Sequence, residues 1–252
     1  MRLQITFFFL LVGLAPALMS QTIAERTSDA NQIMASVLLH DTERESRSGG
    51  YAGHRRYVLD NDYLQKHAEL VADVSCDSAG VKHFNVVTED GWKAANKHVL
   101  RKMLESESET STPSVRPQTR LTPDNYRFTM AKSEVIGGRL TYLIDVTPKR
   151  REKYLIEGRV WIDAQDFALV RAEGKPARNP SFWTRSIHFV HQYQKNGSYW
   201  FPTSTLSVTQ ARLFGTTQVN IEYYDYEPNL KSDLDSLRQS TVQFKEATHV
   251  TN

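Results

Sequence analysis

The sequence has 252 residues and a nearly balanced charge, with 31 lysine and arginine residues against 29 aspartate and glutamate residues. A formal charge of +2 gives no support to bulk nucleic-acid binding, which needs a strongly basic surface. The single cysteine, Cys76, excludes an internal disulfide, and it lies too far along the chain to carry a lipid beside a signal sequence. The length suits one larger domain with a sizeable core.

The first residues have the order of a secretory signal. Arg2 precedes an apolar stretch, Phe7–Leu14, which small residues follow. This stretch is shorter than the ~20 apolar residues that span a bilayer. We therefore expect a signal peptide over residues 1–20 and, for a bacterial source, a periplasmic location, with an uncleaved anchor as the alternative. The candidate cleavage sites follow Ala17, Ser20 and Ala24.

A helix is predicted at the start of the mature chain. Residues 25–43 carry Ile33 and Val37 at helical spacing, after Asp29 as a possible cap. The next stretch, residues 44–53, is polar and rich in glycine at its end, so it predicts a turn.

Three short stretches then alternate between apolar and polar residues: Arg56–Asn61, Glu69–Val74 and Val81–Thr88. Turn-forming residues at 77–80 and 90–91 separate and end them. This pattern predicts an antiparallel meander.

The alternation stops at residue 94. Over residues 94–105 the apolar residues between Val99 and Leu104 fall on one helical face, which predicts a second helix. Residues 105–118 are mostly Glu, Ser, Thr and Pro. Such a stretch cannot offset its ordering entropy by apolar burial, so we expect a mobile loop.

Hairpins are predicted beyond Leu121. Short turn signals such as Gly137-Gly138 and Asn196-Gly197 separate the strands, and strands joined by tight turns are antiparallel neighbours. The predicted fold is therefore α+β, with one strongly curved antiparallel sheet and a few helices on one face, over residues 25–228. A polar C-terminal tail follows at residues 229–252. The predicted strands are Tyr126–Val135, Leu140–Thr147, Lys153–Asp163, Phe167–Gly174, Arg185–Gln194, Tyr199–Thr209 and Gln218–Tyr226.

No catalytic pattern is found in the sequence. His188 and His191 are three residues apart on a strand, so they face opposite sides and cannot chelate one metal ion together. Asp163 and Asp166 are expected to build a turn. The Gly-x-Ser-x-Gly elbow of serine hydrolases and the glycine loops that hold phosphates are absent. We expect neither enzymatic activity nor a cofactor nor a metal.

The densest basic cluster consists of Lys149, Arg150, Arg151 and Lys153, next to Pro148 at a hairpin tip. It could contact anionic lipid head groups or an acidic partner, since each such residue contributes about 1 kcal/mol near an anionic surface. A solvated turn is the simpler interpretation.

Two aromatic blocks, residues 180–183 and 199–202, either close the end of the sheet core or line the mouth of an apolar cavity. The strands at 140–146 and 154–162 each have one continuously apolar face. Few helices are available to cover it, which favours an unfilled apolar cavity. Which face points inward stays open, because a register shift of one residue reverses every assignment. The predicted lining residues are Tyr142, Ile144, Val160, Trp161, Phe182, Trp183, Phe189 and Phe201.

Three motifs carry a family resemblance: Gly158–Asp163, Ala168–Arg171 and Tyr199–Pro202. With the signal, helix and meander around them, the chain resembles the LolA/LolB superfamily of outer-membrane lipoprotein-sorting proteins and the first domain of RseB/MucB sigma-factor regulators. The resemblance covers most of the mature chain. It implies an open, strongly curved half-barrel, lidded by helices, whose apolar concavity takes acyl chains by binding and release.

The resemblance leads us to expect a periplasmic, monomeric, non-catalytic carrier or chaperone for a lipid or a lipoprotein acyl chain, with an envelope membrane protein as a further partner. The lack of a lipid-attachment cysteine argues against a LolB-like receptor, and a single domain argues against a complete RseB-like sensor. The alternative is an envelope regulatory or scaffold protein that binds a protein partner through its sheet edge or basic hairpin.

Overall fold

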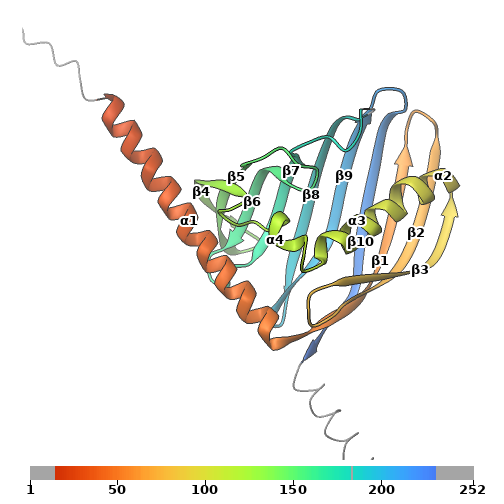
Figure 1. The fold of residues 1–252 in the computed structure, drawn as a ribbon, viewed down its shortest axis with the longest axis horizontal. Coiled ribbons are helices and arrows are strands. Elements are labelled where there is room, and N and C mark those ends of the chain that lie inside the picture. Colours follow the sequence, from red (N-terminus) through yellow and green to blue (C-terminus); the bar gives the residue numbers. More distant parts are fainter. Residues whose placement is uncertain (1–14, 183, 231–252) are drawn as a thin grey trace, which may run out of the picture.

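The computed structural model describes residues 15–182 and 184–230. In this part of the chain, ten strands form one antiparallel sheet in the order β3-β2-β1-β10-β9-β8-β7-β6-β5-β4 (Figure 1). The helices are α1 (Ala15–Arg47), α2 (Lys93–Ala95), α3 (Arg101–Ser111) and α4 (Arg116–Thr119), with a π-helical turn at Asn96–Leu100 between α2 and α3. The strands are β1 (Ser48–Asn61), β2 (Lys66–Cys76), β3 (Lys82–Gly91), β4 (Tyr126–Ile136), β5 (Arg139–Pro148), β6 (Ile156–Asp163), β7 (Leu169–Pro176), β8 (Thr184–Asn196), β9 (Tyr199–Ala211) and β10 (Gly215–Leu230).

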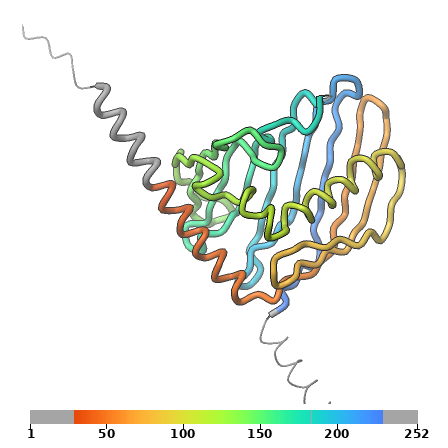
Figure 2. Tube along the Cα trace, in the orientation of Figure 1, coloured from red at the N-terminus to blue at the C-terminus, as the bar shows by residue number. Residues whose placement is uncertain are grey.

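The order of the strands explains where the helices lie. β1 pairs with β2 on one side and with β10 on the other, so the first and last described strands are neighbours inside the sheet. β3 and β4 follow each other in sequence but form the two opposite edges. The connection between them, residues 92–125, therefore crosses the face of the sheet from edge to edge, and it carries α3 and α4 (Figure 2).

The half of the sheet next to α1 has a closed apolar core. Ala30, Met34 and Val37 of α1 are buried, and their spacing of three and four residues puts them on one helical face. They pack on the inner face of strands β4 to β7, whose alternate residues point the same way. The buried sheet residues of this core include Tyr126, Phe128, Ile144, Val146, Val160, Ile162 and Ala172.

The half of the sheet under α3 is covered differently. Leu100 and Leu104 pack on buried residues of β1, β2 and β10. Further along α3, the Oγ of Ser108 donates a hydrogen bond to the carbonyl oxygen of Lys82 (2.8 Å), and the Lys82 amide donates one to the Oγ of Ser111 (2.8 Å). The second half of α3 is therefore tied to the edge strand β3 by polar contacts.

The predicted antiparallel sheet with a few helices is confirmed, and each predicted strand overlaps an observed one. The strong curl that we expected is not found in the sheet. The signal peptide predicted at residues 1–20 and the tail predicted at 229–252 fall largely outside the described residues.

The turn predicted at residues 44–53 is wrong. α1 continues to Arg47, and β1 begins at Ser48. Gly50 lies in this strand with a φ of +109°, and a Cβ there would lie 1.9 Å from the carbonyl oxygen of Cys76. The glycine thus allows β1 to approach β2 closely, a role that sequence pattern does not distinguish from a turn.

The mobile loop predicted at residues 105–118 is also wrong, because α3 extends to Ser111 and α4 occupies Arg116–Thr119. The prediction assumed that only apolar burial could order this segment. The bonds of Ser108 and Ser111 to Lys82, together with ion pairs of Glu107, order it instead.

Candidate functional site

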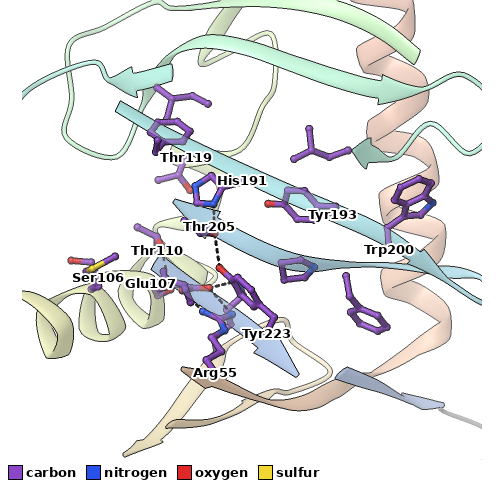
Figure 3. Close-up of a pocket in the computed structure, with 18 of the residues that line it drawn as sticks. Arg55, Ser106, Glu107, Thr110, Thr119, His191, Tyr193, Trp200, Thr205 and Tyr223 are labelled. Carbon is purple, nitrogen blue, oxygen red and sulfur yellow. Dashed lines mark hydrogen bonds and ion pairs between the residues drawn. The ribbon is translucent and has the colours of Figure 1, made fainter. Parts of the chain in front are cut away.

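A cavity with a volume of about 900 Å³ lies between the sheet, the end of α1 and α3 (Figure 3). α1 contributes Asp41 and Arg44 to its wall, and α3 contributes Met103 and Glu107. Side chains of β1, β8, β9 and β10 form most of the rest. The cavity therefore lies where the apolar cover of α1 ends and the polar cover of α3 begins.

One part of the cavity is lined by aromatic and aliphatic side chains. Phe189 of β8 and Phe201 of β9 both face it. The rings of Tyr199 and Phe201 are stacked at 6.1 Å between centroids, and the ring of Tyr226 lies 5.6 Å from that of Phe201. Other apolar lining residues are Met103, Ile156, Leu169, Ile187, Trp200 and Pro202. A wall of this kind is suited to apolar ligand groups.

The same cavity also contains a cluster of three charged side chains. The guanidinium of Arg55, which is only 2% exposed, donates two hydrogen bonds to the Glu107 carboxylate, at 2.6 and 3.1 Å. The Nζ of Lys82 donates a third, at 2.7 Å. One carboxylate thus faces two cations, so the cluster has a surplus of one positive charge.

Tyrosine side chains hold Arg55 in place. Its Nε donates to the hydroxyl of Tyr226 at 2.6 Å, and Nη1 donates to the hydroxyl of Tyr57 at 3.2 Å. The guanidinium carbon lies 4.8 Å from the ring centroid of Tyr223 and 5.2 Å from that of Phe84. These contacts compensate for the burial of the charge.

Burial and the charges of the cluster shift the pKa of several side chains at the cavity. Burial alone would raise the pKa of Glu107, but the charges of Lys82 and Arg55 outweigh it and hold that pKa well below its usual value. Burial lowers the pKa of His191 to about 4, so its imidazole is neutral at pH 7. Burial also raises the pKa of Tyr193 to about 12. At neutral pH both rings are therefore uncharged hydrogen-bonding groups.

A hydrogen-bonded chain runs across three neighbouring strands above Arg55. The hydroxyl of Tyr223 lies 2.8 Å from the Oγ1 of Thr205, which lies 2.6 Å from the Nδ1 of His191 (Figure 3). These three hydrogen-bonded polar side chains lie next to one another along one wall of the cavity.

A second depression, of about 690 Å³, adjoins the first beside the turn between β2 and β3. Tyr51, Lys82, Glu107 and Thr110 line both. The charged cluster therefore stands at the junction of the apolar cavity and a more polar space.

Trp200 is held at the cavity wall by a hydrogen bond from its Nε1 to the carboxylate of Asp166 (3.0 Å). Asp166 also pairs with Lys195 and Arg139. The carboxylate of Asp163 accepts the amides of residues 165 and 166, which confirms that this aspartate builds the turn after β6.

The structure places the residues predicted to line a cavity in several environments. Phe189 and Phe201 line the cavity described here. Tyr142, Ile144 and Val160 point to the same face of the sheet but belong to the core beneath α1. A ligand-binding role for all of them stays a prediction.

Trp161 lies on the other face, because it alternates with Val160, and its Nε1 donates a hydrogen bond to Glu134. Phe182 is 71% exposed in the loop between β7 and β8, and the guanidinium of Arg212 lies 4.5 Å from its ring. Trp183 lies outside the described residues.

The predicted basic cluster lies in the connection from β5 to β6. Arg150 is held by the side chain of Asn125 and the carbonyl of Gln118 (2.8 and 2.6 Å). Lys153 lies at the cavity wall, with its Nζ 4.1 Å from the ring centroid of Tyr154. Lys149 and Arg151 stand beside them in the same connection.

The two histidines are separated as the strand spacing predicts. His191 lines the large cavity, whereas His188 lines a different depression that is formed by β5, β6, β7 and β8. Within the described residues, no group of three His, Cys, Asp or Glu side chains is placed to hold a metal ion.

Sequence reasoning missed Arg55, Lys82 and Glu107. A signal for Arg55 was present, since Arg55, Tyr57 and Leu59 share one strand face and the last two are apolar. A charged residue on the buried face of a strand indicates a partner elsewhere in the fold. The partner, Glu107, lay in the stretch predicted as a loop.

The fold and the site define an α+β protein in which one antiparallel sheet and a polar helix enclose a partly apolar cavity. The chain belongs to a family of unknown function, DUF5686, whose model matches residues 101–226, half of the chain. The match includes Glu107, His191 and Tyr223 but neither Arg55 nor Lys82. No curated protein matches the sequence.

Several solved structures are similar at low identity. One is a domain from Vibrio parahaemolyticus described as outer membrane lipoprotein-sorting, 12% identical, with 76% of this chain and 91% of that chain covered and a TM-score of 0.38. A LolA superfamily protein from Nitrosomonas europaea is 9% identical over 79% and 92% of the two chains, with a TM-score of 0.36. MucB in its complex with MucA from Pseudomonas aeruginosa is 8% identical over 80% and 99%, with a TM-score of 0.28.

At identities of at most 12% and TM-scores of at most 0.38, these structures do not assign a function to this chain. No helix in the described part of the chain is long and apolar enough to cross a membrane.

Proposed function

We propose that the protein is a non-catalytic carrier that binds an acyl chain of a lipid or lipoprotein in the cavity beneath α3. The observation that supports this most is the cavity itself, whose volume of about 900 Å³ falls in the usual range of small-ligand sites. Its wall combines aromatic and aliphatic side chains with polar and charged ones, among them Arg55, Lys82 and Glu107. Each buried methylene of a chain contributes about 0.8 kcal/mol.

The predicted signal sequence supports export, and we propose that the protein works as a monomer in the periplasm of a bacterial source. Binding and release would then be its whole activity. An envelope membrane protein, from which cargo is received or to which it is delivered, is the further partner that this function requires.

The test begins with native mass spectrometry of the protein purified from its own envelope, followed by lipid extraction. We expect a stoichiometric acyl species. Ser207 lines the cavity, so Ser207→Trp should fill part of it and lower the loaded fraction. Leu206 lies next to it on the other face of β9 and is 37% exposed, so Leu206→Trp is the matched control. A bare polypeptide that also takes up no fluorescent fatty acid would exclude the carrier.

One observation supports a second function, the binding of an envelope protein. β3 is an edge strand, and Val87 on it is 53% exposed. An edge of this kind can accept a further strand from a partner. A pull-down that recovers a protein through wild-type β3 but not through Val87→Pro, from material free of lipid, would favour this function over the carrier.

A further inference from the structure

We propose that the ligand of this cavity is a single-chain amphiphile with one anionic head group, which binds at Lys82 beside Arg55 while its chain lies against Phe189 and Phe201. This inference rests on the proposed function and adds the chemical class of the ligand. Carboxylate and phosphate heads share the required chemistry, and the experiment below separates them.

The charge of the cluster provides the first argument. Arg55 and Lys82 share the single carboxylate of Glu107, which leaves one positive charge without a counterion in the cluster. Of the neighbouring acids, Asp41 pairs with Arg44 at 2.6 Å. Glu45 on the same wall pairs with Arg120 at 3.1 Å, outside the cavity lining. A bound anion would therefore complete the pairing.

The hydrogen-bonding capacity of Lys82 provides the second argument. An ammonium group has three N–H donors, and the Nζ of Lys82 has one partner among the described residues, the Glu107 carboxylate. Its side chain is 29% exposed and faces the junction of the two depressions. Arg55, in contrast, is nearly saturated, with four bonds to Glu107, Tyr57 and Tyr226. Lys82 is thus the group that can bind a head group directly, and Arg55 supports it.

The arrangement of the wall gives the third argument. The cavity wall carries both the charged cluster and aromatic side chains, and Tyr226 links them, since it accepts a hydrogen bond from Arg55 and its ring lies 5.6 Å from that of Phe201. A ligand that fills the cavity therefore needs both a polar group and an apolar part. A neutral head would leave the surplus charge unpaired in a partly desolvated site, and a cationic head would be repelled. A lysine ammonium is a compact charge without a preferred acceptor geometry, so it accepts either a carboxylate or a phosphate.

The test is displacement of the neutral probe N-phenylnaphthylamine from the purified protein by four ligands with the same chain. We expect dodecanoate and dodecyl phosphate to displace the probe at about tenfold lower concentration than dodecanol, since a bond to a charged group commonly contributes that much. Dodecylamine should be the weakest. A difference between the first two ligands would identify the preferred head group.

Three variants, two of them with opposite expected effects, separate a head-group site from a merely structural ion pair. Lys82→Met should abolish the preference for dodecanoate over dodecanol, and Lys82→Arg should keep it. Glu107→Gln breaks the same ion pair but leaves both cations, so it should increase that preference. If both Lys82→Met and Glu107→Gln weaken all four ligands equally, the cluster only holds α3 and the inference is overturned.

A test on the wild-type protein remains if a variant does not fold. Raising the salt concentration should weaken dodecanoate and leave dodecanol unchanged, because salt screens the charge of the head group. Equal displacement by dodecanoate and dodecanol at every salt concentration would overturn this inference and leave the carrier function standing. Displacement by none of the ligands would instead overturn the carrier function.

Discussion

The two helices that cover the sheet, α1 and α3, are held on it by different interactions. α1 buries Met34 and Val37 against Ile144 and Val160, and the residues at this contact are almost fully excluded from water. Leu100, directly before α3, and Leu104 in its first half pack on the sheet, but the second half of α3 is held by hydrogen bonds and by the ion pairs of Glu107.

This difference indicates where a binding site can form on a sheet that helices cover on one face. Water does not readily replace the close-packed apolar contacts beneath α1, so this half of the sheet face is closed to ligands. Polar contacts can be exchanged for water or for a ligand at little net cost, so the half under α3 keeps an open cavity.

The closed half should be the more sensitive to truncation. Ile144 is fully buried, so Ile144→Ala should lower the free energy of unfolding by about 2–5 kcal/mol through lost burial and the space left behind. Phe201→Ala at the cavity should cost less stability and should weaken binding of an apolar probe. Urea unfolding and probe titration of both variants measure the contrast, and a larger stability loss for Phe201→Ala would contradict it.

The ion pairs of the second cover should be coupled. Arg55→Met removes a buried cation and leaves Glu107 with Lys82 alone, so we expect a loss of about 1–3 kcal/mol in unfolding free energy. Adding Glu107→Gln should restore part of this loss, because the carboxylate that lost its partner is then also gone. Urea unfolding of both single variants and the double variant gives the coupling energy. Purely additive losses would show that the residues do not act as a pair.

The pH dependence of the unfolding free energy should come from His191 and Glu107, which line the cavity beneath α3. The folded pKa of His191 is about 4, below its ordinary value of 6.5, so the unfolded chain binds more protons between these values. The stability that this group contributes is then full well above pH 6.5 and falls as the pH drops toward 4, by at most about 3 kcal/mol. His191→Gln should flatten this part of the curve. Glu107, whose folded pKa is depressed, adds a further loss below about pH 4.5, where the unfolded carboxylate becomes protonated.

The smallest change in unfolding free energy is expected at Trp200 in the cavity wall. Trp200→Phe keeps an aromatic ring at the cavity but removes the bond to Asp166, so it should cost about 1 kcal/mol of unfolding free energy. Probe affinity should change little. A large loss of affinity with unchanged stability would show that the indole N–H, and not the ring, faces the ligand.

Most of the sheet was predictable from local signals. Alternation and tight turns located every strand, because both are properties of a few neighbouring residues. The same alternation places Ile144 and Val160 on the face that points inward and Trp161 on the other face, once the register is known.

The charged cluster was not predictable in the same way. Arg55, Lys82 and Glu107 belong to separate elements, and their meeting depends on the path of residues 92–125 across the sheet. No short window of sequence contains that information. The polar composition of residues 105–111 even suggested disorder, because the partners that order them lie on β1 and β3.

The pairing of β1 with β10 has a consequence for how the protein folds. The hydrogen bond from Arg55 to Tyr226 joins residues 171 positions apart, and contacts of such long range form slowly because the chain between them must first be closed into a loop. Strands β4 to β9 can pair one hairpin at a time, whereas the wall that contains Arg55 forms only when β10 pairs with β1. A chain shortened before β10 would lack this wall, so a cavity able to hold a ligand requires the pairing of β1 with β10.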